Sequence, residues 1–258
     1  MKHIASAQND TLKNLRKWLS QSKARKTDRV MVLEGIHLLS ALLQAGQTPQ
    51  QVLVREDCIG HPEIAACLTQ LPAGVAVSVA TEAFAKVTAL THAAEIISVV
   101  AWPEAVPPPL NGSVVVLENL QDPGNVGTIL RSAAAAGVTN VLLSPECVDV
   151  YSPKVLRAGM GAHFLLNIHT EVALLPWLAA YQGRSLATAL DERAVSVYAE
   201  DLRQDVALVF GNEGAGVSAA TIAAADQTVI IPMLGQTESL NVAMAATVCL
   251  FERMRQIL

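Results

Sequence analysis

The 258-residue sequence has few charged residues, few aromatic residues and no long uninterrupted apolar stretch. Charged residues make up 16% and aromatic residues 4%, whereas hydrophobic residues make up 52%. This composition excludes a disordered chain and indicates a packed globular protein. No stretch approaches the roughly 20 apolar residues of a transmembrane helix, and the polar residues 1–10 lack the apolar segment of a secretion signal. We therefore expect a soluble, cytoplasmic protein that does not bind a membrane.

Closely spaced cysteine pairs are also missing. The four cysteines, Cys58, Cys67, Cys147 and Cys249, are scattered along the chain. Their spacing matches neither a zinc site nor a disulfide framework, so we expect them to be buried as small apolar residues. No cluster of metal-ligating residues is evident, and no metal is predicted.

The net charge of -5 conceals an uneven distribution. Residues 1–35 hold eight basic and three acidic side chains, a net charge of +5, so the remaining residues carry -10. A cationic segment can bind a polyanion because neutralised phosphates release their counterions. Lys23, Arg25, Lys26 and Arg29 are therefore candidates for phosphate contact. The alternative is a solvated face of an amphipathic helix.

A proline-rich segment divides the chain. Pro103 and the run Pro107-Pro108-Pro109 remove backbone donors and favour an extended path. We predict a linker at 103–109 between a domain at 1–102 and a domain at 110–258. Before the linker, apolar runs expected to be strands alternate with helical patterns, which indicates a small α/β module. The expected strands are 51–54, 75–79 and 96–101, and the expected helices are 9–20, 36–45 and 62–71.

After the linker, short apolar runs recur that are nearly continuous and bounded by turn residues. This pattern is typical of strands buried on both faces of a parallel sheet. The expected strands are 114–117, 141–143, 164–168, 185–190, 207–210 and 229–231. A helix is expected over 126–137, where apolar residues recur at the spacing of one helix face. Ser152 followed by Pro153 predicts the start of another helix.

Three polar segments each follow an expected strand, which is where ligands bind in open parallel sheets. In the first, residues 117–131, Asn125 can cap the helix that follows an Asp-Pro-Gly turn. Steps of three residues place Asn125, Thr128 and Arg131 along one side of that helix. An arginine there suits a substrate phosphate or a developing negative oxygen. A surface ion pair is the alternative for Arg131.

The second segment, residues 210–216, contains three glycines that let the backbone approach a ligand closely, and it places Glu213 inside the loop. The third, residues 230–242, leads into the C-terminal helix, for which Ser239 is a suitable N-cap. Its backbone groups, with Asn241 near the helix N-terminus, could hold a small polar ligand. A plain strand-to-helix turn is the alternative for both segments.

Together and in this order, the segments resemble the three signature motifs of the SpoU/TrmH class of SPOUT RNA ribose methyltransferases. The first motif matches Asn125, Gly127 and Arg131, and the second matches the Gly-Asn-Glu-Gly sequence at 211–214. The third matches Ile-Pro-Met at 231–233 and Ser-Leu-Asn-Val at 239–242. Residues 151–162 also resemble the family, so the likeness extends over most of 114–251.

The resemblance implies an α/β fold with a SPOUT-type parallel sheet and a C-terminal trefoil knot, preceded by a small α/β substrate-binding domain. It also implies a homodimer, S-adenosylmethionine as cofactor and structured RNA as substrate, with ribosomal RNA favoured over transfer RNA. The catalytic residues would be Arg131, Asn125 and Glu213. The cofactor-binding residues would be Thr188, Leu190, Gly211, Asn212, Gly216, Ile231, Pro232, Ser239, Leu240 and Asn241. Lys23, Arg25, Lys26 and Arg29 would bind RNA.

The implied reaction is an in-line attack of the ribose 2'-oxygen on the sulfonium methyl group. A guanidinium normally stays protonated, so we expect Arg131 to orient the RNA phosphate and stabilise alkoxide charge, with base catalysis left open. Glu213 and Asn125 would shape the pocket and orient Arg131, and Asn241 and Ser239 would fix the cofactor loop. One alternative is a noncatalytic RNA-binding protein with the same fold. Another is a dehydrogenase-like nucleotide enzyme, against which the absent dinucleotide fingerprint counts.

Overall fold

The computed structural model describes residues 1–88, 95–191 and 193–258, and it divides into two compact units. The first unit consists of Met1–Glu104 and Tyr151–Phe164, and the second consists of Ala105–Val150 and Leu165–Leu258. The first boundary between the two units lies after Glu104, inside the segment 103–109 that was predicted to be a linker. The segment Tyr151–Phe164 lies in the first unit, although the sequence places it within the expected second domain.

The first unit contains a five-stranded sheet in the order β1-β4-β3-β5-β2. Its strands are β1 (Lys2–Ile4), β2 (Val30–Glu34), β3 (Gln51–Arg55), β4 (Ala76–Val79) and β5 (Ile96–Ala101). Strands β1, β4 and β3 are parallel, whereas β5 runs antiparallel to both β3 and β2. All five residues of β2 are buried, because helices cover both faces of the sheet.

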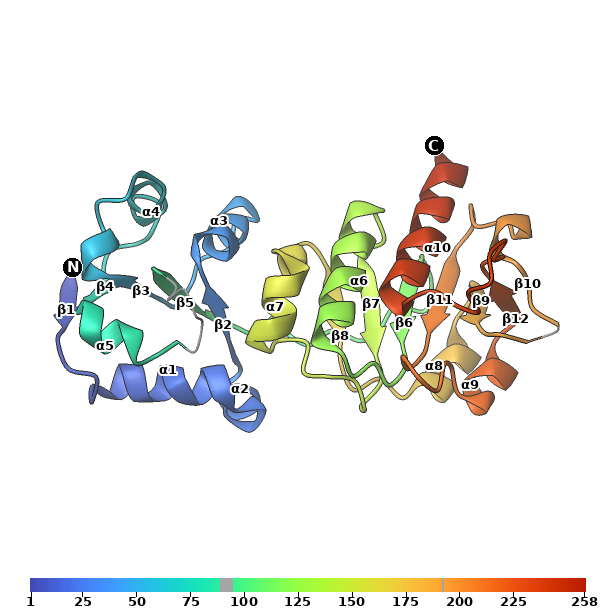
Figure 1. The fold of residues 1–258 in the computed structure, drawn as a ribbon, viewed down its shortest axis with the longest axis horizontal. Coiled ribbons are helices and arrows are strands. Elements are labelled where there is room, and N and C mark those ends of the chain that lie inside the picture. The colour runs from blue at the N-terminus through green and yellow to red at the C-terminus, as the bar shows by residue number, and fades with distance from the viewer. Residues whose placement is uncertain (89–94, 192) are drawn as a thin grey trace. The chain divides into compact units, whose positions relative to one another are not determined.

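The helices of the first unit are α1 (Asp10–Ser20), α2 (Ser22–Asp28), α3 (Ile36–Gln44), α4 (Pro62–Leu68), α5 (Thr81–Ala85) and α7 (Pro153–Gly159). Helices α1 and α5 lie on one face of the sheet and α3 and α4 on the other (Figure 1). Leu12 and Leu15 of α1 and Phe84 of α5 are almost fully buried in one hydrophobic cluster with strand residues. Burial of these apolar side chains is what stabilises the first unit.

The second unit contains a seven-stranded sheet in the order β10-β12-β9-β11-β6-β7-β8. Its strands are β6 (Val114–Leu117), β7 (Asn140–Leu143), β8 (Asn167–His169), β9 (Arg184–Thr188), β10 (Val195–Ser196), β11 (Val206–Phe210) and β12 (Gln227–Ile230). Every neighbouring pair is parallel. Every residue of β6 and β11 is buried, as expected for central strands of a parallel sheet. The predicted α/β class with a parallel sheet is confirmed.

Helices cover both faces of this sheet as well. They are α6 (Pro123–Ala135), α8 (Leu174–Ala180), α9 (Ala219–Ala224) and α10 (Val242–Ile257). Helices α8 and α9 lie on one face, where Trp177 and Tyr181 join the core, and α6 and α10 lie on the other (Figure 1). A hydroxyl contact of 2.7 Å between Ser132 and Thr247 joins α6 to α10. Because all strands are parallel, their carboxyl ends meet at one edge.

Two predicted helix caps are wrong by two or three residues. Helix α6 is capped by Asp122, whose carboxylate accepts the Asn125 amide N–H at 2.8 Å, so Asn125 lies inside the helix. Helix α10 is capped by Asn241, whose Oδ1 accepts the N–H groups of Ala243 and Met244. Ser239 therefore lies in the preceding loop. The predicted cap at Ser152 is confirmed, since its hydroxyl accepts the Val155 N–H at the start of α7.

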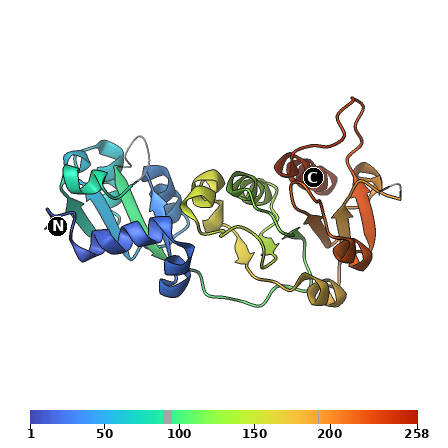
Figure 2. The same cartoon turned by 60° about the horizontal axis from the view of Figure 1, so that its bottom comes forward.

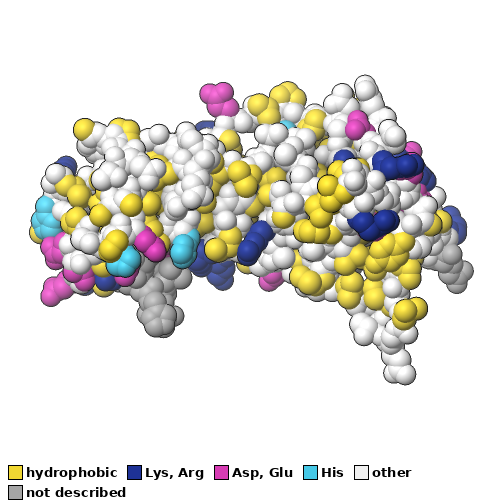
Figure 3. Space-filling view, turned by 90° about the horizontal axis from the view of Figure 1, so that it is seen from above, with side chains coloured by type: hydrophobic (Ala, Val, Ile, Leu, Met, Phe, Trp, Pro, Cys, Tyr) yellow, Lys and Arg dark blue, Asp and Glu magenta, His cyan; other side chains and the backbone are white. Residues whose placement is uncertain are grey.

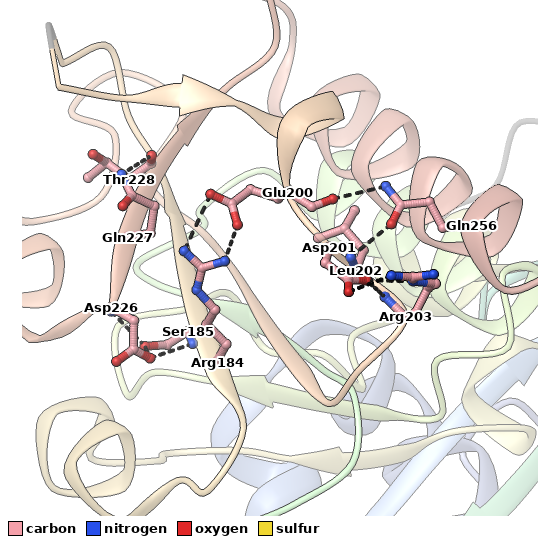
Figure 4. Close-up of polar contacts among 10 residues, drawn as sticks. All are labelled: Arg184, Ser185, Glu200, Asp201, Leu202, Arg203, Asp226, Gln227, Thr228 and Gln256. Atoms are coloured by element: carbon pink, nitrogen blue, oxygen red, sulfur yellow. Dashed lines mark hydrogen bonds and ion pairs between the residues drawn. The ribbon is translucent and has the colours of Figure 1, made fainter.

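Polar contacts hold the outer strands of the second unit in place (Figure 4). Arg184 of β9 pairs with Glu200, which follows the short 3-10 helix Val197–Ala199. The Gln256 side chain on α10 donates to the Glu200 carbonyl at 3.1 Å and accepts the Leu202 N–H at 2.9 Å. These contacts fix the segment after β10 between β9 and the end of α10.

All four cysteines are free thiols. Cys58, Cys67 and Cys249 are buried, as predicted, whereas Cys147 is only partly buried. Burial raises the pKa of Cys249 to about 12, so this thiol stays protonated at neutral pH. Within the described residues, no helix is both long enough and apolar enough to cross a membrane.

Candidate active site

A cavity of about 780 Å³ lies at the carboxyl edge of the parallel sheet in the second unit. Its walls come from the loops that follow β9, β11 and β12 and from the start of α10. Eight of the ten predicted cofactor-binding residues line it: Thr188, Leu190, Gly211, Asn212, Gly216, Ile231, Ser239 and Leu240. Pro232 and Asn241 are not among the lining residues. The loop between β12 and α10 projects from the unit, and Leu234 in it is fully exposed (Figure 2).

The glycines of the loop after β11 have a steric explanation. A Cβ atom at Gly211 would lie 2.1 Å from the carbonyl carbon of Gly216 and 2.1 Å from the amide nitrogen of Val217. Two backbone hydrogen bonds between Asn212 and Gly216, of 3.0 and 2.9 Å, close the turn, and Gly216 adopts a φ of 71°. The backbone therefore folds back on itself so tightly that Gly211 has no room for a side chain.

The Glu213 carboxylate joins this loop to the start of α6. Its Oε1 accepts the Asp122 N–H at 3.0 Å and the Asn125 side-chain amide at 3.2 Å, and its Oε2 accepts the Gln121 N–H at 3.3 Å. The Asn241 amide in turn donates to Asn125 Oδ1 at 3.0 Å. Asn125 thus links Glu213 to Asn241, and the three polar segments singled out in the sequence meet in one place.

Three carboxylates line the cavity, those of Asp191, Glu213 and Glu238, against one guanidinium, that of Arg193. Arg193 pairs with Asp191 at 3.0 Å, and its hydrogen bond lowers the pKa of Asp191. Burial alone would raise the pKa of Glu213, but hydrogen bonds from Asp122, Asn125 and Gln121 together lower it. Both groups are therefore ionised at neutral pH, and the cavity favours a cationic ligand.

Arg131 lies apart from the contacts that join the loops. It is exposed on α6, six residues after Asn125, which is about 9 Å along the helix axis. In the part of the chain that the structure describes, no ion pair includes Arg131. The Asn125 amide contacts Glu213 and Asn241 instead of the guanidinium. The expectation that Glu213 and Asn125 orient Arg131 is therefore not met by this geometry.

The four basic residues predicted to bind RNA differ in exposure. Lys23, Lys26 and Arg29 are exposed, although Arg29 also lies over the Trp102 ring, 5.8 Å from its centroid. Arg25 is only 4% exposed, and its guanidinium donates to the Trp18 carbonyl at 2.5 Å. Arg25 is held inside the first unit, and only the other three side chains are exposed for contact with RNA.

Sequence reasoning missed several residues of the site. Asp191 and Glu238 line the cavity, and each lies in a loop that follows a strand, which is the signal that could have identified them. Glu118 was also missed. Its carboxylate accepts the Ser218 N–H at 2.7 Å and the Thr221 hydroxyl at 2.6 Å, which fixes the start of α9 beside the cavity. Among the described residues, no group of three or more acidic, histidine or cysteine side chains could hold a metal ion.

Comparison with known proteins identifies both parts of the chain. Residues 112–251 match the SpoU rRNA Methylase family, and residues 9–98 match the MRM3-like substrate binding domain. An uncharacterized tRNA/rRNA methyltransferase of Synechocystis sp. is 35% identical over 98% of this chain and 93% of its own. The 23S rRNA (guanosine(2553)-2'-O)-methyltransferase RlmP of Bacillus subtilis is 31% identical over 97% of this chain and 98% of its own.

Solved structures agree with these matches. An rRNA methyltransferase from Sinorhizobium meliloti is similar over 100% of this chain and 98% of its own, with a TM-score of 0.85 and 27% identity. A structure of an AdoMet-bound rRNA methyltransferase from the same organism has a TM-score of 0.84 and 28% identity over the same shares. The resemblance inferred from the three motifs is confirmed, and the chain belongs to the SpoU rRNA methylase family.

Proposed function

We propose that this chain transfers a methyl group from S-adenosylmethionine to a ribose 2'-hydroxyl of ribosomal RNA. The observation that carries the proposal is the acidic cavity whose walls come from the family's motif loops and whose loops are joined through Asn125, Glu213 and Asn241. The relatives named as 23S rRNA 2'-O-methyltransferases favour ribosomal over transfer RNA. A cytoplasmic location accords with this substrate.

The cavity fits the cofactor in size and charge. Its volume of about 780 Å³ lies within the usual range for a small-molecule site. The acidic lining suits a sulfonium cation, and apolar Leu190 and Leu240 at the wall suit an adenine ring. Backbone groups around Gly211, Ile231 and Leu240 would hold the cofactor, while Pro232 and Asn241 would act by shaping the loop.

When bound, S-adenosylmethionine would supply a sulfonium methyl group: the ribose 2'-oxygen would bond to the methyl carbon as the carbon–sulfur bond breaks, and the demethylated thioether would leave. The residues of this chain then have two tasks. Glu213, Asn125 and Asn241 hold the motif loops together, so that the cavity keeps its shape before substrate arrives. The exposed Arg131 guanidinium contacts an RNA phosphate and stabilises negative charge that develops on the 2'-oxygen.

The first unit would bind the RNA, as its match to a substrate-binding domain supports. Lys23, Lys26 and Arg29 present exposed positive charge for phosphate binding. Replacing any one of them with alanine should reduce the dependence of RNA affinity on salt, which distinguishes binding to phosphates from binding to bases.

We also propose a homodimer and a C-terminal trefoil knot, both of which accompany the family resemblance. Met244 and Phe251 of α10 are 49% and 39% exposed, and their spacing of seven residues places them on one face of the helix. Hydrophobic side chains gather on the side of this unit that is seen from above in Figure 3. An exposed apolar helix face of this kind suits a subunit interface.

Two measurements test the proposal. Calorimetry should detect binding of S-adenosylmethionine, and the purified protein should transfer a labelled methyl group to ribosomal RNA and leave transfer RNA unlabelled. If the protein binds RNA but neither binds the cofactor nor labels any RNA, the proposal is wrong and the chain is a noncatalytic RNA-binding protein with the same fold. Mapping 2'-O-methyl sites in cells with and without the gene would identify the nucleotide.

A further inference from the structure

The segment Tyr151–Phe164 links the two units in an unusual way. It lies in the middle of the region that matches the methyltransferase family, yet it packs as part of the first unit. In sequence it is the crossover between the parallel strands β7 and β8 of the second unit. The chain therefore passes between the units at three places, after Glu104, Val150 and Phe164.

An ion pair attaches this segment to β2. Glu34, the last residue of β2, pairs with Arg157 in the last turn of α7. The Glu34 side chain is only 4% exposed and that of Arg157 35%, and the Thr88 hydroxyl also donates to Glu34 at 2.8 Å. A buried carboxylate without a cation is strongly unfavourable, so Glu34 requires Arg157 to remain in place.

Two further contacts fix the same segment at other points of the first unit. A Cβ atom at Gly161 would lie 2.6 Å from the Ala41 Cβ of α3, so the backbone at Gly161 lies directly against α3. The Tyr151 ring lies 4.7 Å from the Trp102 ring, centroid to centroid. Contacts to β2, to α3 and to the residue after β5 thus hold both ends and the middle of the segment.

We propose that Glu34 and Arg157 form a positioning pair that makes methyl transfer depend on the first unit. The pair keeps the β7 to β8 crossover packed within the first unit, so that the unit that binds RNA is coupled to two strands of the sheet that carries the cavity. The inference rests on the proposed function, since it requires RNA bound by the first unit and methyl transfer in the second.

The test compares Glu34→Gln with Arg157→Gln. Glu34→Gln removes the buried charge and retains an oxygen that can accept from Thr88, so it is the milder change. Asp57→Asn is the matched control, because it weakens the Arg55–Asp57 ion pair of the same unit, in which neither residue belongs to Tyr151–Phe164. The measurements are kcat, the Kd values for cofactor and RNA, and hydrogen exchange of residues 151–164.

We expect Glu34→Gln to lower kcat between about tenfold and a hundredfold, because misalignment of bound reactants alone has effects of this size. Both Kd values should stay within about twofold of the unmodified protein, since neither binding site is altered. Hydrogen exchange should increase in residues 151–164 and stay unchanged in β6 and β11. The double variant should be no slower than Arg157→Gln alone, because both changes break the same pair.

An unchanged kcat in Glu34→Gln together with faster hydrogen exchange in residues 151–164 would overturn the proposal. An equal loss of kcat in Asp57→Asn would also overturn it. A parallel loss of cofactor affinity would indicate general damage to the fold and also count against it. Hydrogen exchange needs no RNA, so the attachment of the segment can be tested even if the unmodified protein methylates no RNA. An unmodified protein that methylates no RNA would refute the proposed function and not the attachment of the segment.

Discussion

Replacing Glu213 with glutamine tests whether its hydrogen bonds hold the cavity loops together. The substitution keeps the shape of the side chain but turns one carboxylate oxygen into an NH2 group. In either orientation, that group faces a donor, since Oε1 accepts from Asp122 and Asn125 and Oε2 accepts from Gln121. At least one hydrogen bond to a charged acceptor is lost, and the others become neutral and weaker.

A hydrogen bond to a charged group contributes about 1.5 to 3 kcal/mol. Because Glu213 is exposed and water can replace part of the loss, the lower half of that range applies, roughly 1.5 to 2 kcal/mol. We expect the cofactor to bind when the loops are joined by these hydrogen bonds, so its Kd should rise by about 10- to 30-fold. Calorimetry with S-adenosylmethionine measures this change directly.

Glu238→Gln is the matched control. Glu238 also lines the cavity, is exposed and carries the same charge, but none of the hydrogen bonds found within the described residues involves its side chain. Its substitution should therefore change the cofactor Kd by less than about threefold, the effect of one solvated charge. Equal effects of the two substitutions would show that charge alone matters, and the role assigned to the Glu213 hydrogen bonds would be wrong.

Other residues of the same site give three more predictions. Arg131→Ala should lower kcat by about a hundredfold or more while leaving the cofactor Kd unchanged, because Arg131 lies outside the cavity wall; retained turnover would remove it from the chemistry. Gly211→Ala should destabilise the fold by about 3 kcal/mol, the upper end of the usual range for overpacking, in chemical denaturation, because rigid backbone atoms lie 2.1 Å from the new Cβ; a stable variant would contradict the loop geometry. The native pKa of Glu213 lies below the ordinary 4.5, so its stabilisation is complete above 4.5 and is lost as pH falls through the native pKa. The difference in unfolding free energy between the unmodified protein and Glu213→Gln should therefore be constant near neutral pH and shrink as the pH falls below about 4.5, and a constant difference at lower pH would be inconsistent with this linkage.

The central strands of the parallel sheet were predictable because burial on both faces demands continuous apolar runs, as in β6 and β11. The two-residue edge strand β10 was not predicted, because its first residue is exposed and it is too short to form an apolar run. Strand β1 was missed because it is three residues long and only Ile4 is buried. The run at 164–168 was expected to be one strand. Its first residue instead ends the 3-10 helix Ala162–Phe164, and β8 begins only at Asn167, because the segment before it packs against the first unit.

Local sequence identified the loops of the site but not the contacts between them. Ser239 and Asn241 are both good N-cap residues, and neither propensity nor spacing decides between them. In the structure, Asn241 caps α10 and also contacts Asn125, which lies 116 residues earlier. The Glu34–Arg157 pair spans 123 residues in the same way. Such contacts depend on the completed fold, which periodicity and motif spacing do not encode.

The discontinuous make-up of the two units limits how the protein can be divided for expression. No cut at a single peptide bond yields both units whole, because residues 151–164 would remain on the wrong fragment. A fragment beginning at Ala105 would carry Arg157 and Tyr151 without Glu34 and Trp102, leaving an aromatic ring that is 5% exposed in the intact chain open to water. Such a fragment should be less stable than the same residues in the intact chain, whereas a version with residues 151–164 replaced by a short polar connector offers a rational route to an isolated catalytic half.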